Sequence, residues 1–313
     1  MNNLEVEYEL FQSLCLSKYV ERSPSNEQLI KEIRSKGLKI YHDEFSFYVD
    51  ESIAALSENK IRQSLDLEIN QSIHSFNILY KTSSTNKAIT QKCLNGQYSI
   101  LLTEYQSEGQ GRREKKWISP LSDNIYLSMQ FQLTNHQNAH LLPLLTALSI
   151  CKALKKTGID GCQIKWPNDI YLDDKKLAGV LVESRYNAEN GSSYVVGIGI
   201  NVNMQVNNEI NQSWTSLRNQ QNKMFDRNII ISALLSESLE TYNKIAQIDL
   251  TKFMYEWHLL DYLHGSEITI VDKSGTYSAI AHGIANDGAL LIKCSNDIAL
   301  KKVYSADVSI KKR

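Results

Sequence analysis

Residues 104–120, EYQSEGQGRREKKWISP, combine glycines with a dense run of cations. Gly109 and Gly111 let the backbone adopt conformations closed to other residues, and four basic side chains follow with a single acid among them. Such a loop is suited to bind phosphate, whereas a solvated basic loop is the alternative. Trp117 near its end favours a lid that orders over a ligand. The spacing fits neither a P-loop nor a Rossmann turn.

Residues 164–184, IKWPNDIYLDDKKLAGVLVES, predict two strands joined by a tight turn of two aspartates. This hairpin would direct Lys176, Gly179 and Asp169 toward one cleft. Glycine within a strand permits close approach of a ligand to the backbone. Lysine at such a place is suited to neutralise a carboxylate or a phosphate.

Two shorter segments add small polar groups. TSSTN at 82–86 places hydroxyl and amide side chains beside a predicted helix start, where a simple helix cap is the structural alternative. VVGIGINVN at 195–203 interrupts an apolar strand with Gly197 and Gly199, which indicates either a bulge or the approach of a ligand. None of the four segments contains histidine, so the pattern does not indicate a histidine base.

Composition narrows the class of protein. A net charge of −1 gives no global attraction for nucleic acid, so any polyanion binding must be local. The five cysteines are far apart and form no C-x-x-C pair, which predicts a reduced, cytoplasmic, zinc-free protein. The N-terminus is acidic where an export signal would be basic, and the longest apolar stretch, 141–150, is about half of what a bilayer needs. We therefore expect a soluble protein without a membrane partner.

The elements that must position these residues follow from hydrophobic periodicity. Strand-like runs alternate with helical patterns through the middle of the chain, which predicts an α+β sheet covered by helices. The expected strands are 99–103, 124–133, 163–166, 169–172, 177–183 and 193–202, and the expected helices are 139–156 and 228–246.

The two ends of the chain show different patterns. Residues 25–36 have a helical period with Ser25 or Asn26 as cap, and 39–49 read as a hairpin; helical signals upstream suggest three helices before that hairpin. After about residue 265, short strands broken by turns predict a small β-barrel.

In this order the four segments resemble the biotin protein ligase family, the biotin–[acetyl-CoA-carboxylase] ligases. KWPND and KLAGVLVE, at 165–169 and 176–183, are the most specific part, and the resemblance covers nearly the whole chain. It implies an α+β fold in three domains. These are a winged helix-turn-helix-like domain over 1–62, a biotin- and ATP-binding catalytic domain over 63–262 with a mixed β-sheet like class II aminoacyl-tRNA synthetases, and an SH3-like β-barrel over 263–313.

The resemblance also implies a reaction. Biotin would be joined to ATP, with Mg²⁺, to give biotinyl-5′-AMP, and then passed to a lysine of the biotin carboxyl carrier protein of acetyl-CoA carboxylase. A carboxylate is already ionised at pH 7, so the first step needs fixed cations rather than a base. The transfer step needs a neutral amine, and Asp169 is the candidate that accepts its proton.

Family roles carry over by position onto this chain. The catalytic residues would be Lys176, Arg112 and Asp169, with Asp169 also the candidate Mg²⁺ ligand. Biotin would contact Ser84, Thr85, Asn86, Gln106, Gly109, Gln110, Gly111, Arg112, Lys176 and Gly179. ATP would contact Arg112, Lys115, Trp117, Asn168, Lys176 and Asn201. This chain departs from the family pattern in one respect. The family loop reads G-R-G-R-x-G, but Gln110 and Glu114 replace an arginine and a glycine here. How tightly the loop retains the intermediate is therefore an open point.

DNA binding by the N-terminal part stays an open alternative. The predicted helix offers Asn26, Gln28, Lys31 and Arg34 to DNA, but residues 1–62 hold eight basic and eleven acidic side chains, a net charge of −3. DNA-binding modules rely on a basic face. We therefore expect a ligase first, a bifunctional ligase and operator-binding repressor as the alternative, and a lipoate-type acyl ligase as a distant third. A homodimer is also left open.

Overall fold

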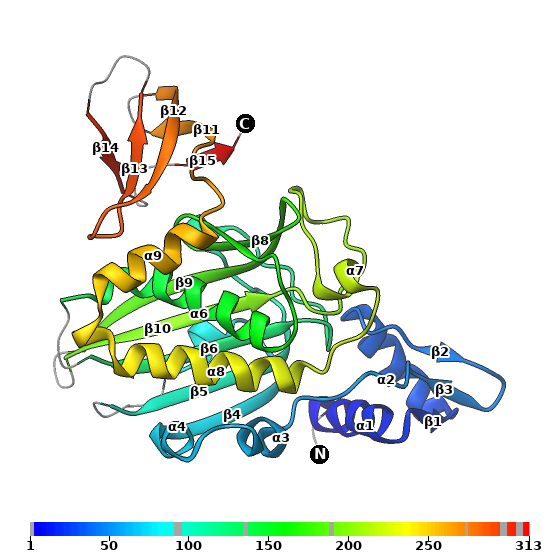
Figure 1. The fold of residues 1–313 in the computed structure, drawn as a ribbon. Helices are drawn as coiled ribbons and strands as arrows, with labels where there is room; N and C mark the ends of the chain where they lie inside the picture. Colours follow the sequence, from blue (N-terminus) through cyan, green and yellow to red (C-terminus); the bar gives the residue numbers. More distant parts are fainter. Residues whose placement is uncertain are drawn as a thin grey trace.

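The structure is a computed structural model that describes residues 3–90, 96–133, 137–187, 191–272, 275–294, 299–304 and 309–312. Figure 1 shows three units in chain order: a small N-terminal unit, a large sheet with helices packed on one face, and a C-terminal sheet. No helix in these ranges is long and apolar enough to cross a membrane.

The N-terminal unit packs two helices against a small antiparallel sheet of order β1-β3-β2. Phe11, Leu14, Ile30, Ile33 and Phe47 form its core. Its elements are α1 (Asn3–Ser17), β1 (Tyr19–Glu21), α2 (Pro24–Ser35), β2 (Tyr41–His42) and β3 (Ser46–Tyr48).

Two predictions for this unit were wrong. The segment expected as a second helix ahead of α2 forms β1, which pairs with β3, because alternation of exposed Tyr19 and half-buried Val20 suits a strand edge. The N-cap of α2 is Ser23 and not the predicted Ser25 or Asn26: the Ser23 hydroxyl accepts a hydrogen bond from Asn26 N, and Pro24 occupies the first turn. The predicted hairpin is present as β2 and β3.

The central unit is a seven-stranded mixed sheet of order β4-β5-β6-β10-β9-β8-β7. All pairs are antiparallel except β4 with β5. The six predicted strands are confirmed, and β4 is an addition. The bounds are β4 (Ile73–Thr82), β5 (Tyr98–Gln106), β6 (Ile125–Gln132), β7 (Gln163–Lys165), β8 (Asp169–Leu172), β9 (Lys175–Asn187) and β10 (Gly191–Ile200).

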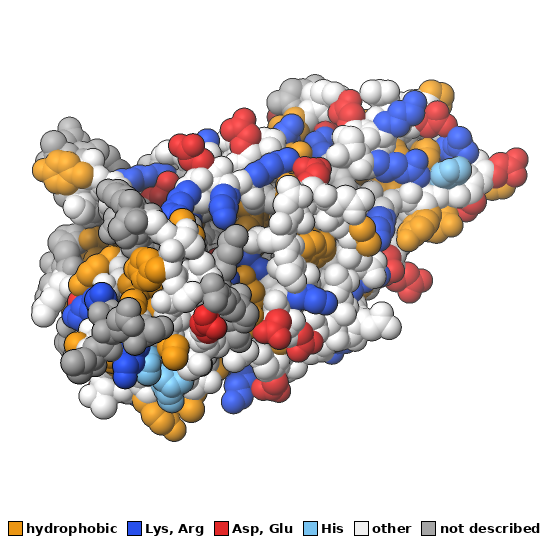
Figure 2. Space-filling view, turned by 90° about the horizontal axis from the view of Figure 1, so that it is seen from above, with side chains coloured by type: hydrophobic (Ala, Val, Ile, Leu, Met, Phe, Trp, Pro, Cys, Tyr) orange, Lys and Arg blue, Asp and Glu red, His pale blue; other side chains and the backbone are white. Residues whose placement is uncertain are grey.

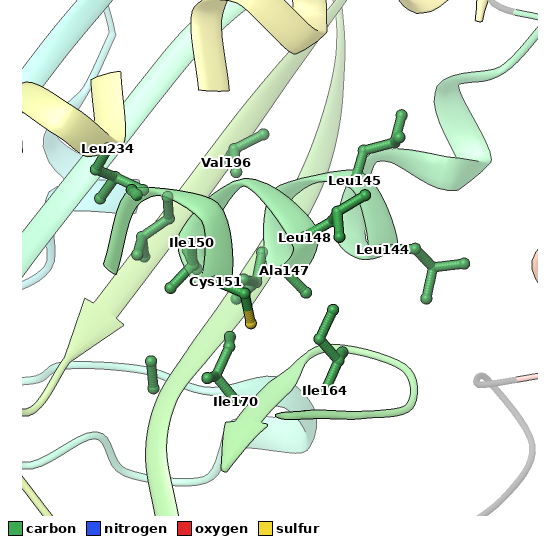
Figure 3. Packing of buried hydrophobic residues seen from close by; sticks show 14 of the residues in the cluster. Leu144, Leu145, Ala147, Leu148, Ile150, Cys151, Ile164, Ile170, Val196 and Leu234 are labelled. Carbon is green, nitrogen blue, oxygen red and sulfur yellow. The ribbon is translucent and has the colours of Figure 1, made fainter. Parts of the chain in front are cut away.

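Helices seal one face of this sheet. Figure 3 shows apolar side chains of α6 (Leu142–Lys156) directed at the sheet residues Ile164, Ile170 and Val196, with Leu234 of α8 (Arg227–Asn243) beside them. Burial of each such aliphatic side chain stabilises the fold by about 1.5–3 kcal/mol relative to leaving it exposed. The helices of this unit are α3 (Glu58–Gln63), α4 (Leu67–Ser72), α5 (Thr85–Ala88), α6 (Leu142–Lys156), α7 (Leu217–Gln221), α8 (Arg227–Asn243) and α9 (Leu250–Leu260).

The C-terminal unit is an antiparallel sheet of order β14-β13-β12-β11-β15. The indole of Trp166 ties it to the central unit, because its Nε1 donates to Gly288 O over 2.9 Å. The short strands predicted after about residue 265 are confirmed in the described part of the chain. The bounds are β11 (Glu267–Asp272), β12 (Gly275–Ile284), β13 (Leu290–Lys293), β14 (Lys301–Val303) and β15 (Ser309–Lys312).

Candidate active site

One cavity of about 820 Å³ brings the four polar segments together. It lies against the strands β8, β9 and β10 and under residues 110–118. Of the residues expected to contact biotin, ATP or Mg²⁺, only Gly109 does not line it. The lining includes Ser84, Thr85, Asn86, Gln106, Gln110, Gly111, Arg112, Lys115, Trp117, Asn168, Asp169, Lys176, Gly179 and Asn201.

The hairpin of β8 and β9 places the central lysine. Asp173 and Asp174 both have positive φ, as a two-residue hairpin turn requires. The register then shifts, so that Gly179 rather than Ala178 lies opposite Asp169. Lys176 pairs with Tyr171, two residues from Asp169, and therefore lies on the same face of the sheet as Asp169; the shift adds Gly179 to that face. Lys176 Nζ lies 2.8 Å from Asp169 Oδ1. The predicted convergence of Lys176, Gly179 and Asp169 is confirmed.

Residues 109–117, the cationic loop, fold back on themselves over the cavity. Trp117 N donates to Gly109 O over 2.8 Å, and Gly111 N donates to Lys115 O over 2.7 Å. Arg112 lies beneath, where its Nη1 donates to Asn168 Oδ1 over 3.0 Å. Burial lowers the pKa of Arg112, the neighbouring Arg113 adds to this, and Asp169 opposes it.

Asn168 holds this corner of the site together. While its Oδ1 accepts from Arg112, its Nδ2 donates to Val180 O over 2.7 Å, and its own carbonyl accepts from Val180 N. The side-chain oxygen, the side-chain nitrogen and the backbone carbonyl of Asn168 are therefore all hydrogen-bonded in this arrangement. It positions Arg112 over β9 at one end of the cavity.

A buried polar ring forms the other end of the cavity. Thr85 N donates to Gln106 Oε1 over 2.9 Å, and the hydroxyl of Ser128 donates to Asn86 Oδ1 over 2.6 Å. Asn86 Nδ2 in turn donates to Glu183 Oε2 over 2.9 Å. Ser84 stands at the N-cap of α5, but its side chain makes no capping hydrogen bond. The simple cap does not account for Ser84, which instead lines the cavity.

The strand glycines of β10 make room for the protein's own side chains. A Cβ added to Gly197 would lie 2.1 Å from Asn86 Oδ1, and one added to Gly199 would lie 2.4 Å from Trp117 Cε2. β10 pairs with β6 and β9 without any shift of register, so the bulge expected as one alternative is wrong. Each glycine thus seats one predicted contact residue against the sheet.

Trp117 and Asn201 lie at the edge of β10 nearest the cationic loop. The ammonium of Lys176 lies 5.5 Å from the ring centre of Trp117, a cation–π distance. Indole Nε1 of Trp117 is buried and has no hydrogen-bond partner among the described residues. Asn201 is buried, and its Nδ2 donates to Thr215 O over 3.1 Å.

Several cavity residues were missed by the sequence analysis. Residues 209–214 cover one side, where Lys116 Nζ lies 2.9 Å from Glu209 Oε2 and Lys176 N donates to Ser213 O. This segment has no glycine pattern or charge run that could have marked it. Ser128 and Glu183, which orient Asn86, lie on strands whose alternation only indicated burial.

The four DNA candidates are not equally presented. Gln28 and Lys31 of α2 are exposed, but Asn26 Nδ2 donates to Glu21 O and the guanidinium of Arg34 donates to Ile40 O. On the face seen in Figure 2, basic and acidic side chains are mixed rather than gathered by sign. Gln28 Nε2 also donates to Glu32 Oε1 over 3.5 Å, so three of the four predicted side chains make hydrogen bonds within the unit.

Two carboxylates line the cavity, Asp169 and Glu209. No group of three or more His, Cys, Asp or Glu side chains able to hold a metal occurs in the described part of the chain. Mg²⁺, however, is commonly held by one or two carboxylates together with substrate phosphates. Asp169, which lines the cavity beside Lys176 and Arg112, suits that kind of site.

Comparison with known proteins defines the class. The model of the biotin/lipoate A/B protein ligase family matches residues 78–203, the region that carries the cavity. The model of the biotin protein ligase C-terminal domain matches residues 263–311, the C-terminal sheet. The chain thus carries a match to the biotin/lipoate A/B protein ligase family and a match to the biotin protein ligase C-terminal domain.

Individual relatives agree with this assignment. The bifunctional ligase/repressor BirA of Escherichia coli is 33% identical over 213 residues, 67% of this chain and 65% of the relative, so the match spans just under two thirds of that protein. The protein of the same name from Bacillus subtilis is 27% identical over 94% of this chain and 88% of its own. A biotin protein ligase from Aquifex aeolicus, solved with biotin and ATP, is 25% identical with a TM-score of 0.66, over 78% of this chain and all of its own.

Proposed function

We propose that this protein activates biotin with ATP to biotinyl-5′-AMP and transfers biotin to a lysine of a biotin carboxyl carrier protein. The observation that carries the proposal is the convergence of Lys176, Arg112 and the polar ring on one cavity. The ring offers hydrogen-bonding groups suited to the ureido end of biotin. The two cations lie where the carboxylate end and a nucleotide phosphate would meet.

In the first step a carboxylate oxygen of biotin attacks the α-phosphorus of ATP. The bond from that phosphorus to the bridging oxygen of the β-phosphate breaks, and pyrophosphate leaves. Two anions must approach each other, so the barrier falls when fixed cations meet the charge that develops on the phosphate. Lys176 is paired with Asp169, and Arg112 is hydrogen-bonded to Asn168, so both cations are held at the cavity, where they would meet the carboxylate and the phosphate.

Mg²⁺ would be held by Asp169 together with the phosphates of the nucleotide, where it supplies charge neutralisation. In the transfer step the lysine amine attacks the acyl carbon of the mixed anhydride, AMP leaves, and the amine gives up a proton. We infer that Asp169, which faces the cavity, accepts or steers that proton. Biotin and ATP would otherwise contact the residues assigned to them by family position.

A transfer assay with purified protein tests this function. The protein is incubated with ATP, Mg²⁺ and labelled biotin or labelled lipoate, together with a biotin carboxyl carrier domain. We expect biotin, and not lipoate, to become attached to the carrier lysine. A carrier with that lysine replaced by arginine is the control. Equal or preferred incorporation of lipoate would reject biotin as the substrate.

We propose that the chain divides into three domains with the limits 1–62, 63–262 and 263–313. The first would be winged-helix-like and the last SH3-like. We also propose that the protein is cytoplasmic. Two relatives named bifunctional ligase/repressor favour operator DNA as a second partner. The net charge of −3 over residues 1–62, and the internal hydrogen bonds of Asn26 and Arg34, favour a weakly binding or degenerate domain.

A gel shift separates these two possibilities. The probe is a biotin operon control region, with biotin and ATP present. We expect no specific shift at physiological salt, and a Lys31→Glu variant with unchanged ligase activity serves as the matched control. A specific shift that Lys31→Glu abolishes would establish the bifunctional alternative.

A further inference from the structure

We propose that Glu183 is a positioning residue that fixes the direction of the Asn86 side-chain amide, so that the polar ring accepts a hydrogen bond from a ureido N–H of the substrate. The inference rests on the proposed function and names the residue behind its specificity for a ureido ligand. Asn86 lines the cavity and Glu183 does not, so Glu183 would act through Asn86 rather than on a substrate.

The register of β9 with β10 brings Glu183 to this place. Leu181 lies opposite Gly197, and Glu183 lies opposite Val195. Because side chains alternate along a strand, Gly179, Leu181 and Glu183 share one face of β9. Gly179 and Leu181 line the cavity, so Glu183 is the next residue along the same face.

The amide of Asn86 has little room to move sideways. A Cβ added to Gly197 would lie 2.1 Å from Asn86 Oδ1 and 2.8 Å from Asn86 Cγ, so the amide packs directly on the backbone of β10. The backbone of α5 is held as well, because Arg185 donates from Nη1 to Ile89 O over 2.6 Å and from Nη2 to Asn86 O. The movement that remains is a half-turn of the amide, which exchanges its oxygen and nitrogen with almost no change of shape.

Acceptors on β9 decide between the two directions of the amide. Asn86 Nδ2 donates to Glu183 Oε2 over 2.9 Å and to Leu181 O over 3.5 Å. An ionised carboxylate and a backbone carbonyl only accept hydrogen bonds. The opposite direction would bring Oδ1 against the carboxylate, acceptor against acceptor, and would lose the hydrogen bond to a charged group. The nitrogen of the amide therefore faces β9.

The oxygen of the amide consequently faces the rest of the polar ring. The Ser128 hydroxyl lies 2.6 Å from Asn86 Oδ1 and 2.8 Å from Thr85 Oγ1. An amide oxygen has two lone pairs and a hydroxyl supplies one hydrogen, so Asn86 Oδ1 keeps the capacity to accept one further N–H. The ureido ring of biotin offers such N–H groups, and the dithiolane ring of lipoate offers none. The direction set by Glu183 thus favours a ureido ligand.

The test exchanges donor and acceptor between the two side chains. Asn86→Asp brings two carboxylates face to face. In the double variant Asn86→Asp with Glu183→Gln, the new amide can donate to the new carboxylate, whose second oxygen still accepts from the ureido group. The matched control combines Asn86→Asp with Glu68→Gln, because Glu68 is exposed on α4 and does not line the cavity. That control removes the same charge from the protein without supplying a donor at the site.

Calorimetry at pH 8, where carboxylates are ionised, gives the Kd of biotin for each variant. Asn86→Asp should weaken biotin binding by about 100-fold, and the double variant should return to within about tenfold of the unaltered protein, a strongly non-additive result. The control should remain as weak as Asn86→Asp. In biotin-dependent exchange of pyrophosphate with ATP, the KM for biotin should follow these Kd values while kcat changes less than about threefold.

A single variant covers the case in which Asn86→Asp does not fold. Glu183→Leu removes the acceptor and keeps an extended side chain, and it should weaken biotin binding by about 10–100-fold, the usual effect of losing a hydrogen bond to a charged group. Thermal unfolding of every variant gives its Tm, which should stay within a few degrees of that of the unaltered protein for Glu183→Leu.

Three results would overturn the inference while leaving the proposed function intact. The first is a double variant that binds biotin no better than Asn86→Asp, and the second is an equal rescue by Glu68→Gln, which would reduce the effect to net charge. The third is an unchanged Kd of biotin in Glu183→Leu. Failure of the unaltered protein to bind biotin would instead reject the proposed function, and the inference with it.

Discussion

Lys176 lies against the carboxylate of Asp169, so binding of a substrate anion exchanges one partner of the ammonium for another. This arrangement keeps the lysine from being an unpaired buried charge, which would be costly. It also means that the cation is in position before the reacting carboxylate and phosphate arrive.

Replacing Lys176 by alanine should lower the rate of biotinyl-5′-AMP formation by about 10²–10³-fold, the usual effect of losing one group that stabilises a developing oxyanion. The fold should persist, because the side chain packs at the cavity surface rather than in the core. The measurement is biotin-dependent pyrophosphate release, with Lys175→Ala as the control, since Lys175 is exposed and does not line the cavity. Near-normal release by Lys176→Ala would remove Lys176 from the mechanism.

The two glycines of β10 allow a paired prediction. Gly197→Ala would displace Asn86, while Gly199→Ala would displace Trp117, since each added Cβ falls within 2.4 Å of its neighbour. The first change should weaken biotin binding and the second ATP binding, each by about tenfold or more, a cost of about 1.4 kcal/mol. Calorimetry of each variant with each ligand checks this. The assignment of the two ends fails if both variants lose the same ligand.

At the scale of elements, the cationic loop carries a local strain. Arg113 and Glu114 both have positive φ, 54° and 59°, a region that costs a non-glycine residue about 1–2 kcal/mol. Glu114 occupies the position where the family pattern has glycine. The loop therefore keeps the backbone shape that glycine adopts freely, although its sequence has lost that glycine.

Glu114→Gly should consequently be more stable than Glu114→Ala, by about 0.5–1 kcal/mol, after the entropy that glycine costs is subtracted. At an ordinary exposed position the order is reversed, so the sign is diagnostic. Urea unfolding of the two variants gives the difference directly. Greater stability of the alanine variant would show that the left-handed conformation does not persist in solution.

Regular elements with a clear period were predictable from the sequence, and irregular ones were not. The tight turn and both strands of the β8–β9 hairpin followed from two aspartates between apolar runs. β4 was missed because its buried and exposed residues do not alternate regularly, and its parallel pairing with β5 depends on tertiary packing. Residues 209–214 belong to the site through their position alone, which no local pattern encodes.

The site residues were predictable for a similar reason. Strand glycines, loop cations and small polar groups are unusual in their elements, so they were noticed. What the sequence could not show is that Gly197 and Gly199 seat the side chains of Asn86 and Trp117. That relation joins segments about a hundred residues apart and follows only from the order of strands.

At the scale of the whole molecule, the N-terminal and central units are joined by polar contacts. Within the central unit, Arg227 and Glu104 form a buried ion pair of 2.8 Å, and this pair holds the connection between the units because Leu56 N donates to Glu104 Oε1. Lys36 O accepts from Leu121 N, a few residues beyond the cationic loop. The junction therefore lies close to the elements that build the site.

Asp123 gives this junction a pH dependence. It lines a cavity of about 150 Å³ between the units, and burial raises its pKa to about 6, although Arg227, Lys39 and Arg218 counteract the rise. Asp50 faces the same cavity. Because the pKa of this carboxyl is higher in the folded than in the unfolded state, the folded state binds the proton more tightly. The contribution of Asp123 to the free energy of unfolding therefore falls as pH rises from about 4 to 6 and stays low above pH 6.

Asp123→Asn should remove that decline. Relative to the unaltered protein, the variant gains at most about 3 kcal/mol at pH 7.5 and little at pH 4.5, because a pKa change of about two units is worth about 2.7 kcal/mol. Urea unfolding of both proteins at the two pH values measures the difference. A gain that is the same at both pH values would contradict the raised pKa.

The most direct test of the central claim is isotope exchange between pyrophosphate and ATP catalysed by the purified protein. Exchange requires reversible joining of a carboxylate to the α-phosphate, the step that we propose Lys176 and Arg112 promote. The account predicts exchange only when biotin is present, and its near-complete loss in Lys176→Ala but not in Lys175→Ala. Biotin-independent exchange, or none with biotin, Mg²⁺ and ATP all present, would contradict it.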